Sequence, residues 1–238
     1  MSKNNMGSLE STLYRHYLDL LDLYGHPEKY WPQWCSNEKS VEDREKVILG
    51  TILTQRTTWH NAQIALKKLK EAGLLSLDGI AGIVNATDLL THIRPAGFHT
   101  TKPYTLKNVS KFFKEKGGVT EVMKMDMHEI RRGLLNTKGV GKETADTILL
   151  YGLDKPSFVI DEYTFRWVEN LVTGYEVGTL EFVVENEELL SVIKKRNYDR
   201  LHQLFGSSLE PEIELYRNFH ALIIVSQRGV DKSGMEII

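Results

Sequence analysis

The sequence of 238 residues contains a single cysteine, Cys35. One thiol excludes an internal disulfide, a zinc site made of four cysteines and an iron–sulfur cluster held by cysteines. We therefore expect no cofactor of these kinds. A chain that uses so little cysteine fits a reducing cytoplasm, which is where we expect the protein to work.

Long apolar runs are also missing. Runs such as 221–225 are far shorter than the roughly 20 residues that span a bilayer. Residues 1–9 carry Lys3 but no apolar segment behind it, so we expect no secretory signal. The sequence therefore predicts a globular protein without a membrane partner.

Charge of one sign is not in excess, because the net charge is −2. The overall balance thus gives no indication of a nucleic-acid partner. Acidic residues gather in 181–188 and 210–214, whereas basic residues gather in the middle of the chain. A locally basic face can bind phosphates, and ordinary Lys-rich solvated helices are the alternative interpretation. The basic residues are Lys102, Lys107, Lys111, Lys114, Lys116, Lys124, Arg131, Arg132, Lys138 and Lys142.

Apolar residues recur every three or four positions almost throughout the chain, which predicts an all-α fold. Ser40, followed by Glu42 and Asp43, is typical of a helix start. Residues 47–53 are apolar on nearly every side and predict a buried central helix, with a strand as the alternative. Residues 30–34 predict an aromatic loop. Other helices are expected over 13–24, 61–72, 77–83, 87–93, 102–116, 127–135, 142–152, 162–172, near 180–188, 191–196, 198–205 and 210–225, with a loose tail from 229.

The segment 134–146 contains two glycines, Gly139 and Gly141, separated by Val140. Glycine lets the backbone turn sharply between two helices. It also lets N–H groups at the start of the next helix approach a phosphate closely, and Lys142 can add a charge-assisted contact. The pattern predicts a hairpin that holds DNA without reading its sequence. A purely structural corner between two helices is the alternative.

Asp161 follows the extended segment 157–160, about twenty positions after the glycine turn. Aspartate is a favoured N-cap, and capping alone is the alternative interpretation. A helix N-terminus also stabilises an ionised carboxylate. A carboxylate kept ionised in this way can act as a base or stabilise positive charge in an enzyme, so Asp161 is a candidate catalytic residue.

The hairpin, the apolar helix after it and the Val-Ile-Asp sequence ending at Asp161 resemble the endonuclease III branch of the helix-hairpin-helix DNA glycosylases. The resemblance runs over most of the chain. Residues 47–58 resemble the family's first core helix and its Leu-x-x-Gln loop, and 93–98 with Lys102 resemble its second DNA-inserting loop. Glu143 stands where the bifunctional members carry a lysine that attacks the sugar. Because glutamate cannot form a Schiff base, the resemblance implies a monofunctional enzyme without strand-cleaving lyase activity.

Within the superfamily, the segments 30–32, 52–55 and 94–98 are most similar to the 3-methyladenine DNA glycosylase III group, which lacks both the cluster and the lysine. That group lines its base pocket with aromatic residues, and Tyr30 here replaces a tryptophan. A lysine that the group carries after Phe-His-Gly is absent, because Phe219-His220-Ala221 is followed by Leu222. The implied base-pocket residues are Tyr30, Trp31, Pro32 and Trp59.

The resemblance implies that a damaged, alkylated purine is flipped out of the duplex before its bond is cut. Gln55 and Phe98 would fill the hole that the base leaves, Phe98 as an apolar wedge. Asp161 would stabilise the sugar cation and act as base for the attacking water. The implied DNA-binding residues are Gln55, Phe98, Lys102, Gly139, Val140, Gly141, Lys142 and Thr144.

Related hairpins bind a monovalent cation through backbone carbonyls. The resemblance therefore implies Na⁺ or K⁺ at Leu135, Thr137 and Val140, as a bridge to a phosphate rather than a catalytic metal. No other cofactor is implied.

We expect two helical lobes. Residues 36–155 would form a helical barrel ending in the hairpin, and 1–35 with 156–238 would form the second lobe. The expected partner of this monomer is double-stranded DNA that contains a damaged base. Three alternatives stay open: a glycosylase for oxidised or mismatched bases, a non-catalytic DNA-binding module, and a helical protein with no nucleic-acid role.

Overall fold

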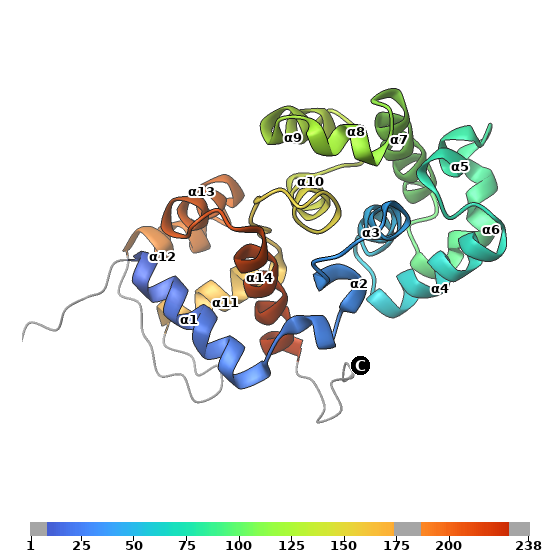
Figure 1. Cartoon of the computed structure of the whole chain (residues 1–238). Helices are drawn as coiled ribbons and strands as arrows, with labels where there is room; N and C mark the ends of the chain where they lie inside the picture. Colours follow the sequence, from blue (N-terminus) through green and yellow to red (C-terminus); the bar gives the residue numbers. More distant parts are fainter. Residues whose placement is uncertain (1–8, 174–186, 229–238) are drawn as a thin grey trace, which may run out of the picture. The chain divides into compact units, whose positions relative to one another are not determined.

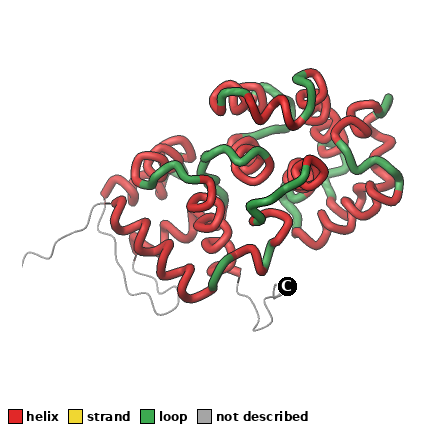
Figure 2. Tube along the Cα trace, in the orientation of Figure 1, coloured by secondary structure: helices red, strands yellow, loops and turns green. Residues whose placement is uncertain are grey.

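The computed structural model describes residues 9–173 and 187–228. Every regular element in these two stretches is a helix (Figure 1, Figure 2). The all-α prediction is therefore confirmed. Among the same residues, no helix combines the length and the apolar character needed to cross a membrane.

The chain divides into two compact units, which we call the hairpin unit, Ser36–Lys155, and the aspartate unit, Met1–Cys35 with Pro156–Ile238. The hairpin unit contains α3 (Val41–Leu53), α4 (Trp59–Glu71), α5 (Leu77–Gly82), η2 (Ala86–Leu89), α6 (Leu90–Ile93), η3 (Arg94–Ala96), α7 (Lys102–Glu115), α8 (Val119–Lys124), α9 (Met127–Leu135), α10 (Lys142–Thr147) and the π-helical η4 (Ile148–Gly152). The described part of the aspartate unit contains α1 (Leu9–Tyr24), η1 (Pro27–Lys29), α2 (Pro32–Cys35), α11 (Glu162–Thr173), α12 (Glu187–Lys194), α13 (Tyr198–Ser208) and α14 (Ile213–Arg228).

Helix α3 forms the centre of the hairpin unit, where it contacts α4, α7, α8 and η4 (Figure 1). It begins after Ser40, whose hydroxyl accepts the N–H of Asp43, as expected of a capped start. Its second half, from Val47 to Leu53, is buried throughout. The prediction of a buried central helix over 47–53 is therefore confirmed, and the strand alternative is wrong.

Helix α14 forms the centre of the aspartate unit, where it contacts α1 and α11 (Figure 1). Its Phe219 is fully buried and packs edge-to-face on Trp167 of α11, with ring centroids 5.3 Å apart. The extended segment before α11 places Phe158 against the same core, with its ring centroid 4.3 Å from that of Phe205. This aromatic packing fixes the N-terminal end of α11.

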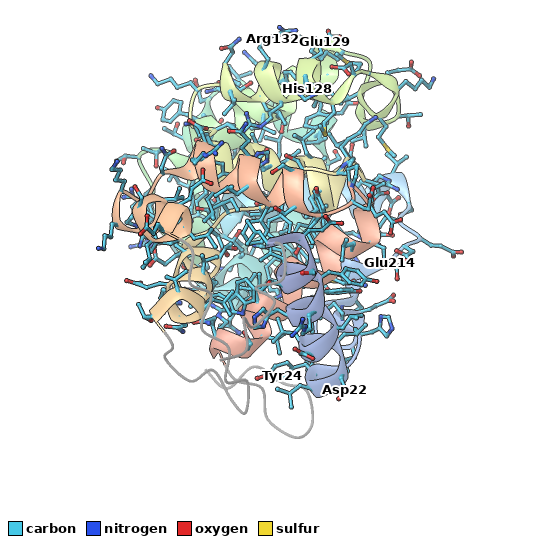
Figure 3. All side chains as sticks on the ribbon, turned by 90° about the vertical axis from the view of Figure 1, so that its left-hand side faces the viewer. Asp22, Tyr24, His128, Glu129, Arg132 and Glu214 are labelled. Atoms are coloured by element: carbon cyan, nitrogen blue, oxygen red, sulfur yellow. The ribbon has the colours of Figure 1, made fainter. Side chains whose placement is uncertain are left out.

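Helix α9 has two contrasting faces. His128, Glu129 and Arg132 lie on its outer surface (Figure 3), whereas Ile130 and Leu134 are buried in the core of the hairpin unit. The helix covers the predicted range 127–135. Its amphipathic pattern therefore orients the start of the hairpin that follows it.

One predicted element differs from the structure, and two others fall mostly or wholly on residues that it does not describe. The aromatic loop predicted over 30–34 contains the short helix α2, in which the carbonyl of Trp31 accepts the N–H groups of Trp34 and Cys35. Most of the helix predicted near 180–188 lies outside the described residues, as does the tail from 229, and α12 begins at Glu187.

Candidate active site

Asp161 lies directly before α11 and caps it. Its Oδ1 accepts the backbone N–H of Thr164 at 2.7 Å and the hydroxyl of the same residue at 3.0 Å. Thr164 is fully buried, and its hydroxyl also contacts the carbonyl of Val159 at 3.2 Å. The predicted N-cap position is therefore confirmed, and Thr164 holds one oxygen of the carboxylate with two hydrogen bonds.

His220 of α14 faces the other carboxylate oxygen, with its Nε2 3.4 Å from Asp161 Oδ2. Burial, the largest influence, raises the pKa of Asp161, but the charge and hydrogen bond of His220 and the two hydrogen bonds of Thr164 together lower it below its ordinary value. The side chain of Asp161 is still 12% exposed. The fold thus keeps this carboxylate ionised without sealing it away.

Sequence reasoning missed the role of His220. The segment Phe219-His220-Ala221 gives no local indication of this contact, because the partner Asp161 lies far earlier in the chain. A signal was nevertheless present: a polar imidazole in an otherwise apolar helix needs a partner when it is buried. His220 is 4% exposed.

The hairpin joins α9 to α10, and only one of its two glycines needs glycine's conformational freedom. Gly139 has φ +98, and a Cβ there would lie 2.0 Å from Thr105 Oγ1. Gly141 has φ −94 and ψ 179, which any residue can adopt, and a Cβ there would meet nothing within 4 Å. The expectation that both glycines are needed for the sharp turn is therefore wrong for Gly141. The space beside the Cα of Gly141 is open.

Val140 anchors the hairpin in the core of its unit and is 8% exposed. Its N–H donates to the carbonyl of Thr137 at 3.0 Å. Lys142 and Glu143 are exposed at the start of α10, whereas Leu135 and Thr137 are half-buried. Nothing in this geometry tests the cation predicted at the carbonyls of Leu135, Thr137 and Val140, which stays a prediction.

Gln55 links the loop after α3 to the hairpin. Its Nε2 donates to the carbonyl of Gly139 at 3.2 Å and to Thr144 Oγ1 at 3.0 Å. The sequence predicts that Thr144 contacts DNA. In the structure Thr144 is buried, and its hydroxyl accepts the hydrogen bond of Gln55 instead. The structure thus brings three of the predicted DNA-binding residues together.

Phe98 is 45% exposed, which is unusual for a phenylalanine. Its backbone is left-handed, with φ +48, as is that of Gly97, with φ +71. Arg56, from the loop that carries Gln55, also has a positive φ of 52, and its guanidinium lies 5.8 Å from the centroid of the Phe98 ring. Backbone strain of this kind is typical of functional loops. Sequence reasoning overlooked Arg56, although it follows Gln55 directly.

The prediction that Lys102 contacts DNA is wrong. Lys102 is 1% exposed, and its Nζ donates to the carbonyls of Leu53 at 2.8 Å and Ala96 at 2.5 Å. Burial lowers the pKa of Lys102 to about 8. A side chain enclosed in this way cannot reach a phosphate, so its role lies inside the protein.

The predicted basic face is smaller than the sequence indicates. Besides Lys102, Arg131 is excluded from it, because its guanidinium forms a bidentate pair with the buried Asp146 at 2.7 and 2.9 Å. The pair ties α9 to α10. The basic residues that are exposed are Lys111, Lys114, Lys124, Arg132, Lys138 and Lys142.

The predicted pocket aromatics belong to both units. In the aspartate unit, the ring centroids of Tyr30 and Trp31 lie 6.4 Å apart, and the hydroxyl of Tyr30 donates to the carbonyl of Tyr24 at 2.9 Å. Pro32 is exposed at the start of α2. In the hairpin unit, Trp59 opens α4 and packs partly buried against the core. That the four form one base pocket stays a prediction.

The described residues contain no group of three or more His, Cys, Asp or Glu side chains that could hold a metal ion. No family model matches the chain. The chain is 40% identical over 215 residues to "Putative DNA repair glycosylase MJ1434" of Methanocaldococcus jannaschii, covering 89% of this chain and 85% of that protein. Endonuclease III of Thermotoga maritima is 28% identical over 148 residues, covering 62% of this chain and 64% of that protein. The chain belongs to the endonuclease III-like DNA glycosylases.

Solved structures agree with this family. The H. pylori 3-methyladenine DNA glycosylase (MagIII) bound to 1,N6-ethenoadenine matches with a TM-score of 0.59 and 26% identity, covering 92% of this glycosylase and 95% of that chain. Tm1821, the 8-oxoguanine DNA glycosylase of Thermotoga maritima, matches with a TM-score of 0.53 and 16% identity, covering 93% and 96%. The second likeness is one of fold alone. The resemblance to the superfamily and to the 3-methyladenine group is thereby confirmed.

Proposed function

We propose that this glycosylase is monofunctional and releases alkylated purines such as 3-methyladenine from DNA by hydrolysis. The observation that carries the proposal is Asp161, a carboxylate at a helix N-terminus whose pKa is held below its ordinary value. Glu143 supports it, because a glutamate at this exposed position of the hairpin provides no amine for lyase chemistry. The likeness to the H. pylori 3-methyladenine DNA glycosylase supports the choice of substrate class.

An alkylated purine carries a positive charge and is already a good leaving group. Its glycosidic bond breaks with the electron pair going to the base, which departs neutral. The ionised Asp161 stabilises the positive charge that develops on the sugar. It then accepts the proton of the water whose oxygen bonds to C1′, so that charge and atoms balance. His220 and Thr164 orient the carboxylate for both roles.

The flipped base stacks among Tyr30, Trp31, Pro32 and Trp59 in this proposal. Aromatic faces attract a cationic ring with roughly 1–2 kcal/mol when water is excluded. Phe98 and Gln55 fill the hole in the duplex; the exposure of Phe98 favours this role.

The hairpin grips the DNA backbone in this proposal. Gly141 is exposed, and the space beside its Cα admits a phosphate oxygen close to the N–H groups of α10. Lys142 adds a positive charge. Leu135, Thr137 and Val140 would hold Na⁺ or K⁺; the Thr137 carbonyl accepts one N–H and has a second lone pair.

The enzyme acts as a monomer in the cytoplasm in this proposal.

A panel of duplexes, each carrying one lesion, tests the proposal. We expect free base from duplexes with 3-methyladenine, and no covalent adduct when borohydride is added with abasic DNA. The Asp161→Asn variant should bind the lesion duplex as the parent does but release base at least about 10²–10³-fold more slowly. Glu162→Gln, which removes a neighbouring exposed carboxylate, is the matched control and should keep the parent rate.

Release only from duplexes with oxidised or mismatched bases would replace the substrate class and leave the role of Asp161 intact. Binding by both parent and variant, with no base released from any duplex, would instead identify a non-catalytic DNA-binding protein.

A further inference from the structure

One buried side chain ties together the two loops that are predicted to enter DNA. Lys102 opens α7, and its ammonium donates to the carbonyls of Leu53 and Ala96, at 2.8 and 2.5 Å. Leu53 is the last residue of α3, and Ala96 is the last residue of η3. The loop with Gln55 leaves the first of these ends, and the loop with Phe98 leaves the second. The ammonium therefore joins the two points from which both loops start.

The chemistry of these two ends explains why a cation suits the position. The last carbonyls of a helix have no partner inside the helix, and the helix C-terminus attracts positive charge. An ammonium has three donors and can serve both carbonyls at once. Burial nevertheless works against the charged form, because it lowers the pKa of Lys102 to about 8. The benefit of this lysine thus lies in what it positions rather than in stability.

Phe98 is held by the same arrangement. The N–H of Lys102 donates to the carbonyl of Phe98 at 3.0 Å, and the Lys102 Nζ lies 5.5 Å from the Phe98 ring centroid. The guanidinium of Arg56, from the Gln55 loop, lies 5.8 Å from the centroid of the same ring. The exposed ring is therefore braced by both loops while its backbone stays in the left-handed region.

Two further residues of α7 contact the hairpin. Thr105 and Asn108 follow Lys102 at three-residue intervals, which places them on one side of the helix. Gly139 packs so closely on Thr105 that a Cβ would lie 2.0 Å from the hydroxyl oxygen. Asn108 Nδ2 donates to the carbonyl of Lys138 at 3.2 Å. One helix face thus contacts both loop origins and the hairpin turn.

We propose that this face of α7, made of Lys102, Thr105 and Asn108, is a positioning device that holds the two loops and the hairpin in one arrangement before DNA binds. Lys102 is its central positioning residue and does not touch DNA. Loops that are ordered in advance lower the entropic cost of binding. The inference rests on the proposed function, since it takes the loop of Phe98 to be one that enters the duplex.

A duplex with a tetrahydrofuran abasic-site analogue and a neighbouring 2-aminopurine tests this without any base release. Insertion of Phe98 unstacks the 2-aminopurine and raises its fluorescence. We expect Lys102→Met to lose most of this rise and to bind the duplex about 10–100-fold more weakly, which corresponds to about 1.4–2.8 kcal/mol. The slope of log Kd against log salt concentration should stay that of the parent, because no phosphate contact is lost.

Lys111→Met is the matched control, because Lys111 is exposed on the same helix. It should keep the full fluorescence rise. Phe98→Ala should abolish the rise, and adding Lys102→Met to Phe98→Ala should weaken binding by less than Lys102→Met does alone, since part of the effect of Lys102 passes through the Phe98 ring. If the parent gives the fluorescence rise but releases no base from any lesion, the proposed function is wrong and this inference still holds.

Three results would overturn the inference. The first is a folded Lys102→Met protein with the parent's fluorescence rise. The second is a salt slope reduced by about 1, which would make Lys102 a phosphate contact. The third is a double variant in which the losses of DNA affinity of Lys102→Met and Phe98→Ala multiply, as they do for independent sites. If Lys102→Met does not fold, Lys102→Gln retains an amide donor for one carbonyl and should show an intermediate rise; a full rise in that variant would equally overturn the inference.

Discussion

The aspartate unit and the hairpin unit each bury a charged side chain at a helix end, and they use it differently. Asp161 lies at a helix N-terminus, where Thr164 and His220 lower its pKa and so favour the charged form. The ammonium of Lys102 lies at the C-terminal ends of α3 and η3, yet burial lowers its pKa to about 8 and so disfavours the charged form. The first environment favours the charge that the proposed reaction requires, whereas in the second a charged group disfavoured by burial holds two helix ends together. The same direction of pKa shift therefore has opposite meanings in the two units.

If geometry governs the hairpin unit, its two glycines should behave in opposite ways. Gly139→Ala should lower the free energy of unfolding by about 2–5 kcal/mol. The alanine would have to adopt a positive φ, and its Cβ would clash with the side chain of Thr105. Gly141→Ala should change it by less than about 0.5 kcal/mol and still weaken DNA binding, because the new methyl group faces the phosphate. Urea unfolding and fluorescence anisotropy measure the two effects. Equal unfolding curves for the two variants would contradict the assignment of the turn to Gly139.

The cost of the buried lysine should be visible as a pH dependence of stability. The pKa of Lys102 is about 8 in the folded protein and about 10.5 when unfolded, so the unfolded chain binds the proton more tightly. The unfolding free energy of the parent should therefore rise by about 3 kcal/mol between pH 8 and 10.5 relative to Lys102→Met. Below pH 8 the penalty is fully present and the difference should be constant. If the difference in unfolding free energy between the parent and Lys102→Met stays constant from pH 7 to 10.5, the buried charge carries no such cost.

If charge governs the aspartate unit, removing the imidazole should move the pH profile of base release. The lowered pKa of Asp161 keeps the parent active as pH falls toward the acid range. His220→Gln removes the contact that lowers the pKa of Asp161 against the effect of burial, so this pKa should rise. The acid limb of the rate profile should therefore move to higher pH. At neutral pH the rate should fall by about tenfold or less. Single-turnover rates across the acid range measure both.

His202→Gln is the control for this variant, because His202 contacts Ser157 at 3.2 Å in the same unit and is absent from the contacts that lower the pKa of Asp161. Its acid limb should coincide with that of the parent. An acid limb that moves equally in both variants would mean that His220 acts only through packing. The lowered pKa of Asp161 contributes stability that is present above the unfolded pKa and lost as pH falls through the folded pKa, and this contribution should be smaller in His220→Gln.

Much of the fold could be predicted because the signals are local. Ser40 and Asp161 cap helices through hydrogen bonds within three residues, and the ends of α9 follow from its apolar spacing. The position of Asp161 beside a helix N-terminus was predictable for the same reason. Short elements were harder: α2 was missed because four residues are too few to show a helical period.

Roles that depend on distant partners were not predictable in this way. Lys102 continues a basic helical pattern, and no feature of that pattern shows that the side chain turns inward to two carbonyls. His220 is one polar residue in an apolar helix, and its contact with Asp161 arises from the packing of α14 against α11. Gly141 looks equivalent to Gly139 in the sequence, although their backbone angles differ.

The sequence by itself determined the helices, their caps, the glycine turn and the candidate carboxylate, because each depends on residues a few positions apart. Only the tertiary structure decided which charges are buried, which oxygen of Asp161 meets His220, and that α7 braces both loops and the hairpin. Burial and long-range pairing are set by elements far apart in the chain: burial lowers the pKa of Lys102, whereas His220 helps to lower the pKa of Asp161 against the effect of burial.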